Sequence, residues 1–241
     1  MKNSNQNKAG MKMKGILYGI GVGTGTSSGI SVNALETIKN CDVLVFPNKS
    51  REDCRACQII NSNLSGIETK KLYFCDFPMT KDKKSLANAW ENCARMICAD
   101  LKEKNVAFLT IGDPSVYSTF FYIKELVEKE GFQTQVITGI PSFCAVAAKL
   151  GMSLALENEQ IHIIPDAEDL EKTFLLSGTL VFMKTGRNLS KLKAFLISHK
   201  NQIREFGAVS NCGFEDEKIM LTPEELDENL YLTVVIVKTR D

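Results

Sequence analysis

The first 150 residues alternate between short apolar runs and stretches with helical periodicity, and no other feature of the chain constrains its fold as strongly. Strand-like runs occur at 15–20, 42–47, 70–74, 106–111 and 134–138. Helical patterns separate them, at 31–39, 52–62, 84–104, 116–130 and 141–150. Strands that alternate with helices predict a parallel sheet with helices on both faces.

Beyond residue 155 the pattern changes, because several strand-like runs follow one another without a helix between them. These runs are 160–164, 179–184, 206–210, 217–221 and 231–238, and the helical patterns are 167–176, 188–199 and 222–228. Strands without a crossover helix favour antiparallel pairing. We therefore expect an α/β protein of two α/β domains, the second with a mixed sheet. The expected division is a flexible tail over 1–13, a parallel-sheet domain over 14–155 and an α+β domain over 156–241.

The composition favours a globular cytoplasmic protein. The 241 residues include 29 basic and 29 acidic side chains, whereas a nucleic-acid-binding domain is usually basic. No apolar stretch reaches the length of a membrane span. The polar start of the chain lacks the apolar core of a signal peptide. We expect neither a nucleic acid nor a membrane as a partner.

The eight cysteines predict reduced thiols, because the chain is large and has no signal peptide. Cys54 and Cys57 form a C-x-x-C pair, which could be half of a zinc or iron–sulfur site. No second C-x-x-C completes four ligands, and the histidines are His162 and His199 alone. We therefore expect no metal site.

The end of the first strand carries four glycines at alternate positions, namely Gly19, Gly21, Gly23 and Gly25. A dinucleotide fingerprint needs a glycine three residues after a Gly-x-Gly pair, which is missing here, and Asp42 precedes the second strand instead of ending it. No Gly-Lys-Ser/Thr follows, so a Walker loop is excluded. A ligand-binding loop and a purely structural tight turn both remain open.

Residues 112–119, Gly-Asp-Pro-Ser-Val-Tyr-Ser-Thr, join the fourth strand to a helix. Ligands of open α/β sheets bind beyond the carboxyl ends of the strands. The hydroxyls of Ser115, Ser118 and Thr119 and the first amides of the helix suit an anionic group such as a carboxylate. Helix capping by Asp113 or Ser115 would explain part of this pattern without a ligand.

Residues 138–142, Thr-Gly-Ile-Pro-Ser, again place glycine and a hydroxyl between a strand and a helix. Three such turns at one edge of a sheet predict a ligand cleft. In the second half, 183–188 and 211–217 also follow strands, and either could be a plain turn.

These segments, in this order, resemble the tetrapyrrole methylase family over Gly15–Val237. The family combines a Gly-rich first loop, a Gly-Asp-Pro turn, a Pro-Gly-x-Ser turn and a strand that ends near Met. Within the family, residues 112–119, the Ser-Phe-Cys-Ala run from Ser142 and the Asp-Glu-Lys-Ile run from Asp216 are similar to methyltransferases acting at C20 of precorrin-2 or its cobalt form.

The resemblance implies a homodimer that takes S-adenosylmethionine and a tetrapyrrole into a trough between two domains. It implies cofactor contacts at Gly112, Asp113, Tyr117, Ser118, Thr119, Pro141, Ser142, Met183, Lys184 and Cys212. It implies substrate contacts at Gly21, Gly23, Thr24, Gly25, Thr26 and Arg187. Basic residues should meet the carboxylates of the substrate, and Lys12, Lys14, Lys49, Arg51, Arg55, Lys184 and Arg187 are the candidates.

The chain departs from the family pattern in two places. Thr24 and Thr26 replace a proline and an aspartate of the first loop, and Ser210–Gly213 replaces Glu-Arg-Ala-Thr. The Gly-Asp-Pro turn is intact, so methyl transfer by positioning, without an assigned general base, is the expected activity. The alternatives are another tetrapyrrole methylase such as uroporphyrinogen-III methyltransferase, a non-catalytic ligand-binding relative and a nicotinamide oxidoreductase.

Overall fold

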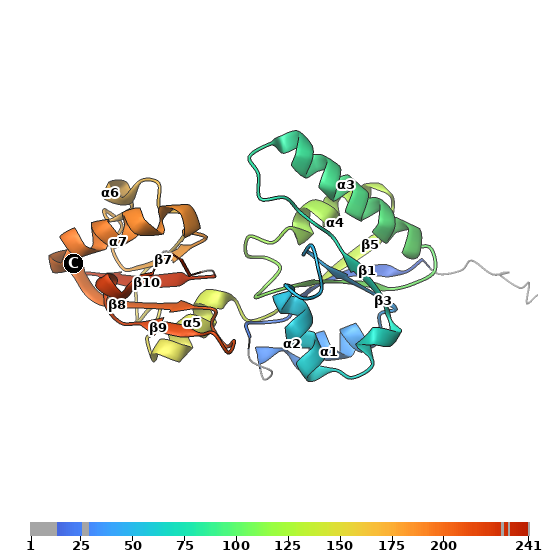
Figure 1. Cartoon of the computed structure of the whole chain (residues 1–241), viewed down its shortest axis with the longest axis horizontal. Coiled ribbons are helices and arrows are strands. Elements are labelled where there is room, and N and C mark those ends of the chain that lie inside the picture. The colour runs from blue at the N-terminus through green and yellow to red at the C-terminus, as the bar shows by residue number, and fades with distance from the viewer. Residues whose placement is uncertain (1–13, 26–28, 228, 231, 241) are drawn as a thin grey trace, which may run out of the picture. The chain divides into compact units, whose positions relative to one another are not determined.

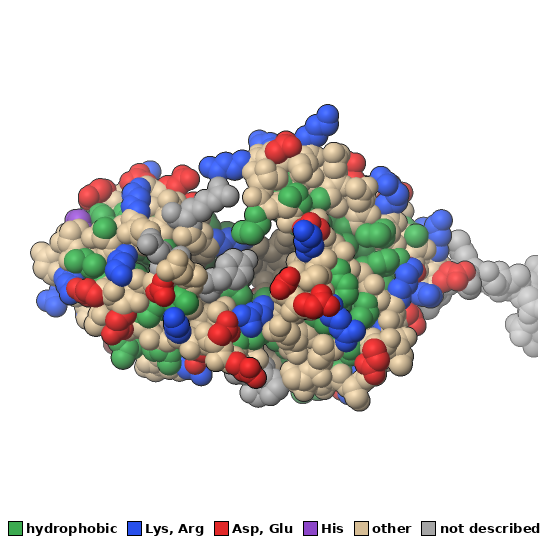
Figure 2. All heavy atoms as spheres, in the orientation of Figure 1, with side chains coloured by type: hydrophobic (Ala, Val, Ile, Leu, Met, Phe, Trp, Pro, Cys, Tyr) green, Lys and Arg blue, Asp and Glu red, His purple; other side chains and the backbone are tan. Residues whose placement is uncertain are grey.

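The computed structural model describes residues 14–25, 29–227, 229–230 and 232–240, apart from the side chain of residue 187. The chain forms two compact units (Figure 1). The first unit comprises the chain up to Val22 together with Ile30–Gly139, and the second comprises Gly23–Gly29 together with Ile140–Asp241. On the face drawn in Figure 2, basic and acidic side chains are interspersed over each unit.

The first unit contains a five-stranded sheet in the order β3-β2-β4-β1-β5. Its strands are β1 (Ile16–Gly21), β2 (Val43–Phe46), β3 (Lys71–Phe74), β4 (Val106–Thr110) and β5 (Gln133–Ile137). All the pairings are parallel, as the alternation of strands and helices predicts. The order differs from the 3-2-1-4 order of dinucleotide-binding sheets, because β4 lies between β2 and β1.

Helices cover both faces of this sheet. They are α1 (Val32–Lys39), α2 (Arg55–Asn63), α3 (Lys83–Asp100) and α4 (Phe120–Lys129), with a 3-10 turn at Ile67–Thr69. Figure 1 shows α1 and α2 on one face and α3 and α4 on the other. Helix α4 begins later than residue 116, where the sequence pattern predicted it, because Tyr117 has a φ of 51° that no α-helix can accommodate.

The second unit contains a mixed sheet in the order β6-β7-β10-β8-β9. Its strands are β6 (Ile161–Pro165), β7 (Thr179–Met183), β8 (Ile203–Ser210), β9 (Lys218–Met220) and β10 (Val234–Thr239). The β6–β7 pair is parallel and the other pairs are antiparallel, which confirms the predicted mixed sheet. The helices are α5 (Ser142–Leu150), α6 (Leu170–Thr173) and α7 (Leu189–Ser198), with 3-10 turns at Gly186–Asn188, Lys200–Gln202 and Pro223–Glu225.

The second unit includes α5, which the sequence assigned to a first domain ending at residue 155. Val146 and Ala147 of α5 are buried against Val181, Val209 and Ile236 of the mixed sheet. The alternate strand residues face the other side, where α7 packs on Leu180, Phe182 and Val235. The division therefore falls before α5, because the apolar face of this helix covers the second sheet.

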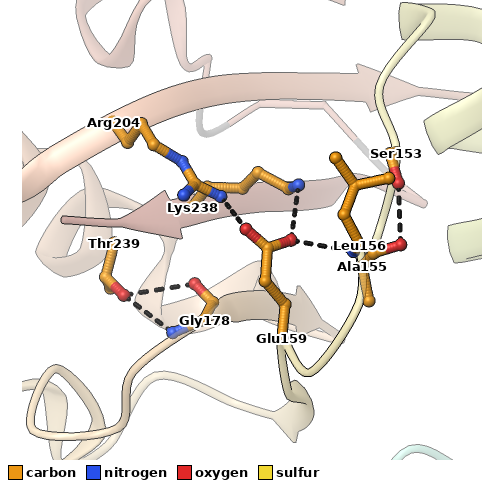
Figure 3. Close-up of polar contacts among 8 residues, drawn as sticks. All are labelled: Ser153, Ala155, Leu156, Glu159, Gly178, Arg204, Lys238 and Thr239. Carbon is orange, nitrogen blue, oxygen red and sulfur yellow. Dashed lines mark hydrogen bonds and ion pairs between the residues drawn. The ribbon is translucent and has the colours of Figure 1, made fainter. Parts of the chain in front are cut away.

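A partly buried ion pair fixes the connection between α5 and β6 (Figure 3). Glu159 accepts hydrogen bonds from the Arg204 guanidinium, from the Leu156 N–H at 3.0 Å and from the Lys238 ammonium at 3.1 Å. Lys238 is only 3% exposed and pairs with Thr179, the first residue of β7. This anchor thus lies at the end of the sheet where β7 begins, and Met183 and its neighbours lie at the other end.

Candidate functional site

Three glycines from neighbouring strand ends converge at the carboxyl edge of the first sheet. Gly21 ends β1, Gly112 follows β4 and Gly139 follows β5. A Cβ atom at Gly21 would lie 2.5 Å from the Gly112 carbonyl oxygen, and one at Gly139 would lie 2.1 Å from the same oxygen. Only glycine allows the backbones to approach this closely. Three of the turns singled out in the sequence therefore lie side by side.

The Asp113 carboxylate holds this junction together and is almost completely buried. Its Oδ1 accepts from the backbone N–H of Ser115 at 2.8 Å and from the Ser115 hydroxyl. Its Oδ2 accepts from the Thr138 hydroxyl at 2.6 Å and from the Gly139 N–H at 2.9 Å. Burial alone would raise the pKa of Asp113, but the hydrogen bonds from these donors outweigh it and lower the pKa. The carboxylate is therefore ionised at neutral pH and uses both oxygens within the protein.

The rest of the 112–119 segment leads into α4. Tyr117 is 43% exposed. The Ser118 hydroxyl lies 3.4 Å from the Thr110 hydroxyl and accepts from the Phe120 N–H at 3.2 Å. Thr119 occupies the N-cap position of α4 without a side-chain hydrogen bond to the helix.

The helices that begin in the predicted site segments differ from the others in their capping. In the described part of the chain, α1, α2, α3 and α6 each receive a hydrogen bond from the side chain of the N-cap residue. Helices α4, α5 and α7 have no such bond, and the N-cap of α5 is Pro141. Free amides at a helix N-terminus can bind an anionic group. The segments 112–119, 138–142 and 183–188 precede these three helices.

In the second unit, the Gly-rich first loop lies against the turn that follows β8. Thr24, buried, shares a side-chain hydrogen bond with Cys212. A Cβ atom at Gly25 would lie 2.3 Å from the carbonyl carbon of Gly213, so glycine is required here as well. The two places where the chain departs from the family pattern are thus in contact with each other.

Acidic side chains hold the turn after β8 in shape. Asp216 accepts from the Asn211 side-chain amide at 2.9 Å. Glu217 accepts from the Gly213 N–H at 2.6 Å and pairs with Lys149 of α5 at 3.0 Å. These bonds fix the backbone of the turn that contains Cys212.

Three predicted cofactor segments, which follow β4, β7 and β8, each contain a residue with a strained backbone. Tyr117, Lys184 and Asn211 have φ values of 51°, 54° and 48°. Such left-handed conformations are uncommon outside glycine and cluster at ligand sites. Of the other predicted residues at the end of β7, Met183 is half-buried and Arg187 lies on the 3-10 turn, its side chain outside the described residues.

Buried polar groups collect where β7 and β8 end. Thr185 and Asn211 are buried there, and Ser210 and Thr233 share a hydrogen bond of 2.6 Å between their hydroxyls. The Thr185 hydroxyl and the Asn211 Oδ1 are buried yet have no hydrogen-bond partner among the described residues. Such groups are rare because each costs about 1–3 kcal/mol. The sequence motifs gave no signal for these two side chains, because burial without a partner is visible only in three dimensions.

The structure places the predicted residues in two groups, one in each unit. The first unit brings together Gly21, Gly112, Asp113, Tyr117, Ser118 and Thr119 along one sheet edge. In the second unit, Gly23, Thr24 and Gly25 lie in the loop that contacts Cys212 and Gly213, Pro141 and Ser142 begin α5, and Met183 and Lys184 end β7. Thr26 and Lys12 lie outside the described residues.

The cysteine side chains differ in burial, since Cys41, Cys54, Cys57, Cys75 and Cys93 are buried, Cys98 and Cys212 are half-buried and Cys144 is exposed. Cys54 caps α2, its sulfur accepting from the Cys57 N–H at 3.4 Å, which accounts for the C-x-x-C pair without a metal. Burial, followed by the nearby Glu217 carboxylate, raises the pKa of the Cys212 thiol. A raised pKa keeps this thiol protonated at neutral pH, so Cys212 is not poised as a nucleophile.

Comparison with known proteins identifies relatives over nearly the whole chain. The model of the tetrapyrrole (corrin/porphyrin) methylases matches residues 16–227. A relative from Methanocaldococcus jannaschii, named a probable cobalt-precorrin-2 C(20)-methyltransferase, is 36% identical over 92% of this chain and 95% of its own length. The cobalt-precorrin-2 C(20)-methyltransferase of Salmonella typhimurium is 28% identical over 76% of this chain and 78% of that protein.

Solved structures share the fold. The cobalt precorrin-4 methyltransferase CbiF matches with a TM-score of 0.67 at 18% identity, covering 92% of this chain and 94% of that one. A uroporphyrin-III C-methyl transferase from Thermus thermophilus, solved with S-adenosylhomocysteine, matches with a TM-score of 0.64 at 16% identity, covering 93% of this chain and 97% of that one. In the described residues, no helix is long and apolar enough to cross a membrane.

Proposed function

Because this chain belongs to the tetrapyrrole (corrin/porphyrin) methylase family, whose members use S-adenosylmethionine, we propose that it methylates C20 of cobalt-precorrin-2. The observation that carries the proposal is the 36% identity over 92% of the chain to a relative named for that reaction. The metal-free substrate, precorrin-2, is the second candidate, because a relative from Sinorhizobium named for it is 24% identical over 92% of this chain. Uroporphyrinogen-III methylation is less favoured, since the relatives named above for C20 activity are 36% and 28% identical to this chain, whereas the uroporphyrin-III C-methyl transferase is 16% identical.

The first unit supplies polar groups that suit the cofactor. Gly112, Tyr117, Ser118 and Thr119 are proposed contacts, supported by the N-cap residue of α4, which makes no side-chain bond to the helix, and by the strained backbone at Tyr117. Asp113 has a different role in this proposal. Its carboxylate is committed to holding the strand ends together, so it shapes the binding edge and contacts the cofactor only through its backbone.

The proposed contacts in the second unit are Pro141, Ser142, Met183, Lys184 and Cys212. The uncapped start of α5 and the positive φ of Lys184 support them. Gly21, Gly23, Thr24, Gly25, Thr26 and Arg187 are proposed for the tetrapyrrole, on the family resemblance of their motifs.

S-adenosylmethionine supplies a methyl group that is already activated on a sulfonium. The work of the protein is to bind, to orient the acceptor carbon and to exclude water. We assign no general base, because the Asp113 carboxylate is fully hydrogen-bonded and the Cys212 thiol has a raised pKa. Catalysis by positioning is therefore the proposed mechanism.

A direct assay tests the activity. The purified protein is incubated with S-adenosylmethionine and either cobalt-precorrin-2 or precorrin-2, and the products are analysed by mass spectrometry. We expect one added methyl group, located at C20 by NMR when the donor carries a ¹³C-methyl. Absence of transfer to both substrates would contradict the proposal. Binding of S-adenosylhomocysteine without transfer to any tetrapyrrole would instead favour a non-catalytic relative.

We propose further that the enzyme acts as a homodimer in the cytoplasm. The family resemblance supports the dimer. The relatives named for cobalamin biosynthesis support the cytoplasm as the location of a biosynthetic enzyme. Sedimentation equilibrium measures the mass in solution, and a monomer at assay concentrations would contradict the dimer.

A further inference from the structure

Two buried thiols from different elements of the first unit lie in contact with each other. Cys75 directly follows β3, Cys93 lies within α3, and their sulfur atoms are 2.7 Å apart. The two residues are 5% and 1% exposed and belong to the same apolar core. We propose that Cys75 and Cys93 are a reversible redox pair, which a hydroperoxide oxidises to a disulfide bond between the end of β3 and α3.

The two sulfur atoms are already held close to bonding distance. A disulfide bond is about 2.0 Å long, so its formation requires only small rotations of the two side chains. The Cys75 N–H donates to the Phe46 carbonyl at 2.9 Å, which continues the pairing of β3 with β2. Cys93 is held by the helix. Neither backbone has to move for the bond to form.

Metal binding explains the pair less well. A structural zinc site needs four ligands, and these two thiols supply only half of such a set. Among the residues that the structure describes, no group of three or more histidine, cysteine, aspartate or glutamate side chains could hold a metal ion. The partly buried Phe77 and Trp90 pack against the core that contains both thiols. The chemistry that remains for the pair is oxidation of one thiol by the other's partner oxidant.

The hydrogen bond between the thiols makes them chemically different. The Cys93 S–H donates to the Cys75 sulfur. This bond outweighs burial and lowers the pKa of Cys75, whereas the same bond, followed by burial, raises the pKa of Cys93. The thiolate is the nucleophile in cysteine oxidation. Cys75 is therefore the thiol that reacts with the oxidant, and Cys93 is the resolving thiol.

The position of Cys75 gives a small oxidant access to it. Residues 76–82 join β3 to α3 without regular secondary structure, and Met79 among them is 82% exposed. Local opening of such a segment needs less free energy than opening of a core helix. Cys93 lies on the covered face of α3, so hydrogen peroxide reaches Cys75 first.

The reaction consists of two balanced steps. The Cys75 thiolate attacks one oxygen of hydrogen peroxide, the O–O bond breaks, and Cys75 becomes a sulfenic acid. The hydroxide that leaves takes up the proton that Cys75 lost and becomes water. The Cys93 sulfur then attacks the sulfenic sulfur, and its proton leaves with the hydroxyl group as a second water. The two thiols lose two electrons, and the peroxide accepts them.

The C-x-x-C pair is a matched control in the same unit. Cys54 and Cys57 are 2% and 0% exposed, as deeply buried as the proposed pair. The Cys54 sulfur accepts from the Cys57 backbone N–H, not from a thiol. Burial raises the pKa of both, that of Cys54 to about 11. We therefore expect these two thiols to stay reduced under conditions that oxidise Cys75.

Peptide mapping tests the proposal. The purified protein is treated with hydrogen peroxide, catalase removes the excess, and the chain is unfolded in N-ethylmaleimide and digested with trypsin without reduction. Cys75 and Cys93 fall in the separate tryptic peptides 72–81 and 85–95, each with one cysteine. We expect a disulfide to join these peptides and dithiothreitol to separate them, while Cys54 and Cys57 carry the maleimide.

Met79 shows whether the oxidant has reached this segment, because it lies in the same peptide as Cys75 and forms a sulfoxide. If Met79 is oxidised while Cys75 and Cys93 both carry the maleimide, the proposal is overturned. A disulfide between Cys54 and Cys57 in place of the expected one would overturn it as well. No ligand enters the experiment, so its outcome is independent of the proposed function.

Two variants test the order of the steps. Cys93→Ser keeps a hydrogen-bond donor beside Cys75 but cannot form the disulfide, so peroxide should leave a sulfenic acid at Cys75, which dimedone labels. Cys75→Ser removes the attacking thiol, so Cys93 should stay unlabelled. A dimedone label on Cys93 in Cys75→Ser, with none on Cys75 in Cys93→Ser, would contradict the assigned roles.

The unfolding temperature shows whether the bond fits the native fold. The bond would close a loop between residues 18 positions apart, which restricts the unfolded chain. Oxidation should raise the thermal unfolding midpoint of wild type by about 5 °C, and dithiothreitol should reverse the rise. Cys93→Ser should show no such rise. An unchanged or lower midpoint in oxidised wild type would contradict a bond that joins β3 and α3 in the folded protein.

Discussion

The Thr138 hydroxyl donates to Oδ2 of Asp113 at 2.6 Å, which ties the end of β5 to the loop after β4. The strand β1 lies between these two in the sheet, so the bond spans the end of a third strand. Asp113 is therefore less a ligand-binding carboxylate than the residue that sets the shape of the edge on which Gly21, Gly112 and Gly139 meet.

Asp113→Asn should destabilise the first unit. An asparagine keeps one acceptor oxygen, but its NH₂ group must face donors, which leaves a buried N–H or hydroxyl without an acceptor. We expect the free energy of unfolding to fall by about 2 kcal/mol, measured by urea denaturation. Asp42→Asn, at an exposed carboxylate of the same unit, is the control and should change it by less than about 0.5 kcal/mol. Equal stability of the two variants would contradict the structural role of Asp113.

Gly139→Ala should be among the least tolerated glycine substitutions. The added methyl would lie 2.1 Å from the Gly112 carbonyl oxygen, and both are backbone positions that cannot rotate away. A cost of about 1–3 kcal/mol in unfolding free energy is expected from overpacking. Gly186→Ala is the control, because nothing lies within 4 Å of a Cβ at that position. A stable Gly139→Ala variant with unchanged S-adenosylhomocysteine affinity would show that the strand ends can separate freely.

The sequence predicted where the helices and strands lie. It predicted less well which strands pair and which sheet each helix covers. Strand periodicity and Gly-rich turns placed all the strands close to their observed bounds and predicted that three turns would share an edge. Periodicity contains no information on long-range pairing, so the insertion of β4 between β1 and β2 was not foreseen. For the same reason, the apolar face of α5 did not reveal which sheet it covers, and Val146 in fact packs on the second.

The stability of the second unit should fall in acid because of Glu159. Hydrogen bonds from Arg204, then from the Leu156 N–H and Lys238, lower the pKa of Glu159 from 4.5 to about 2. A carboxyl group with a lowered folded-state pKa contributes stability above its unfolded value and loses it as the pH falls from about 4.5 toward 2. Glu159→Gln lacks this titration. The difference in unfolding free energy between wild type and Glu159→Gln should therefore shrink between pH 6 and pH 3, and a constant difference would contradict the ion pair.

Glu217 should contribute more through its bond to the backbone than through its ion pair. Its carboxylate accepts from the Gly213 N–H at 2.6 Å and meets Lys149, which is partly exposed, at 3.0 Å. A half-exposed ion pair contributes at most about 1 kcal/mol, whereas a backbone N–H left without an acceptor costs about 1–3 kcal/mol. Glu217→Ala loses both contacts and also the side-chain hydrogen bond with Cys212, whereas Lys149→Met loses only the ion pair and Glu217→Gln keeps an acceptor oxygen. Glu217→Ala should thus reduce the unfolding free energy more than either of the other two variants.

A double-mutant cycle separates the two contributions of Glu217. The coupling energy between Lys149→Met and Glu217→Gln should stay below about 1 kcal/mol, measured by urea denaturation. Because the Gly213 bond fixes the turn that holds Cys212 against Thr24, Glu217→Ala should also weaken S-adenosylhomocysteine binding, and Glu217→Gln should restore it. If Glu217→Gln binds as weakly as Glu217→Ala, the charge of Glu217 governs ligand binding, and the hydrogen bond to Gly213 does not.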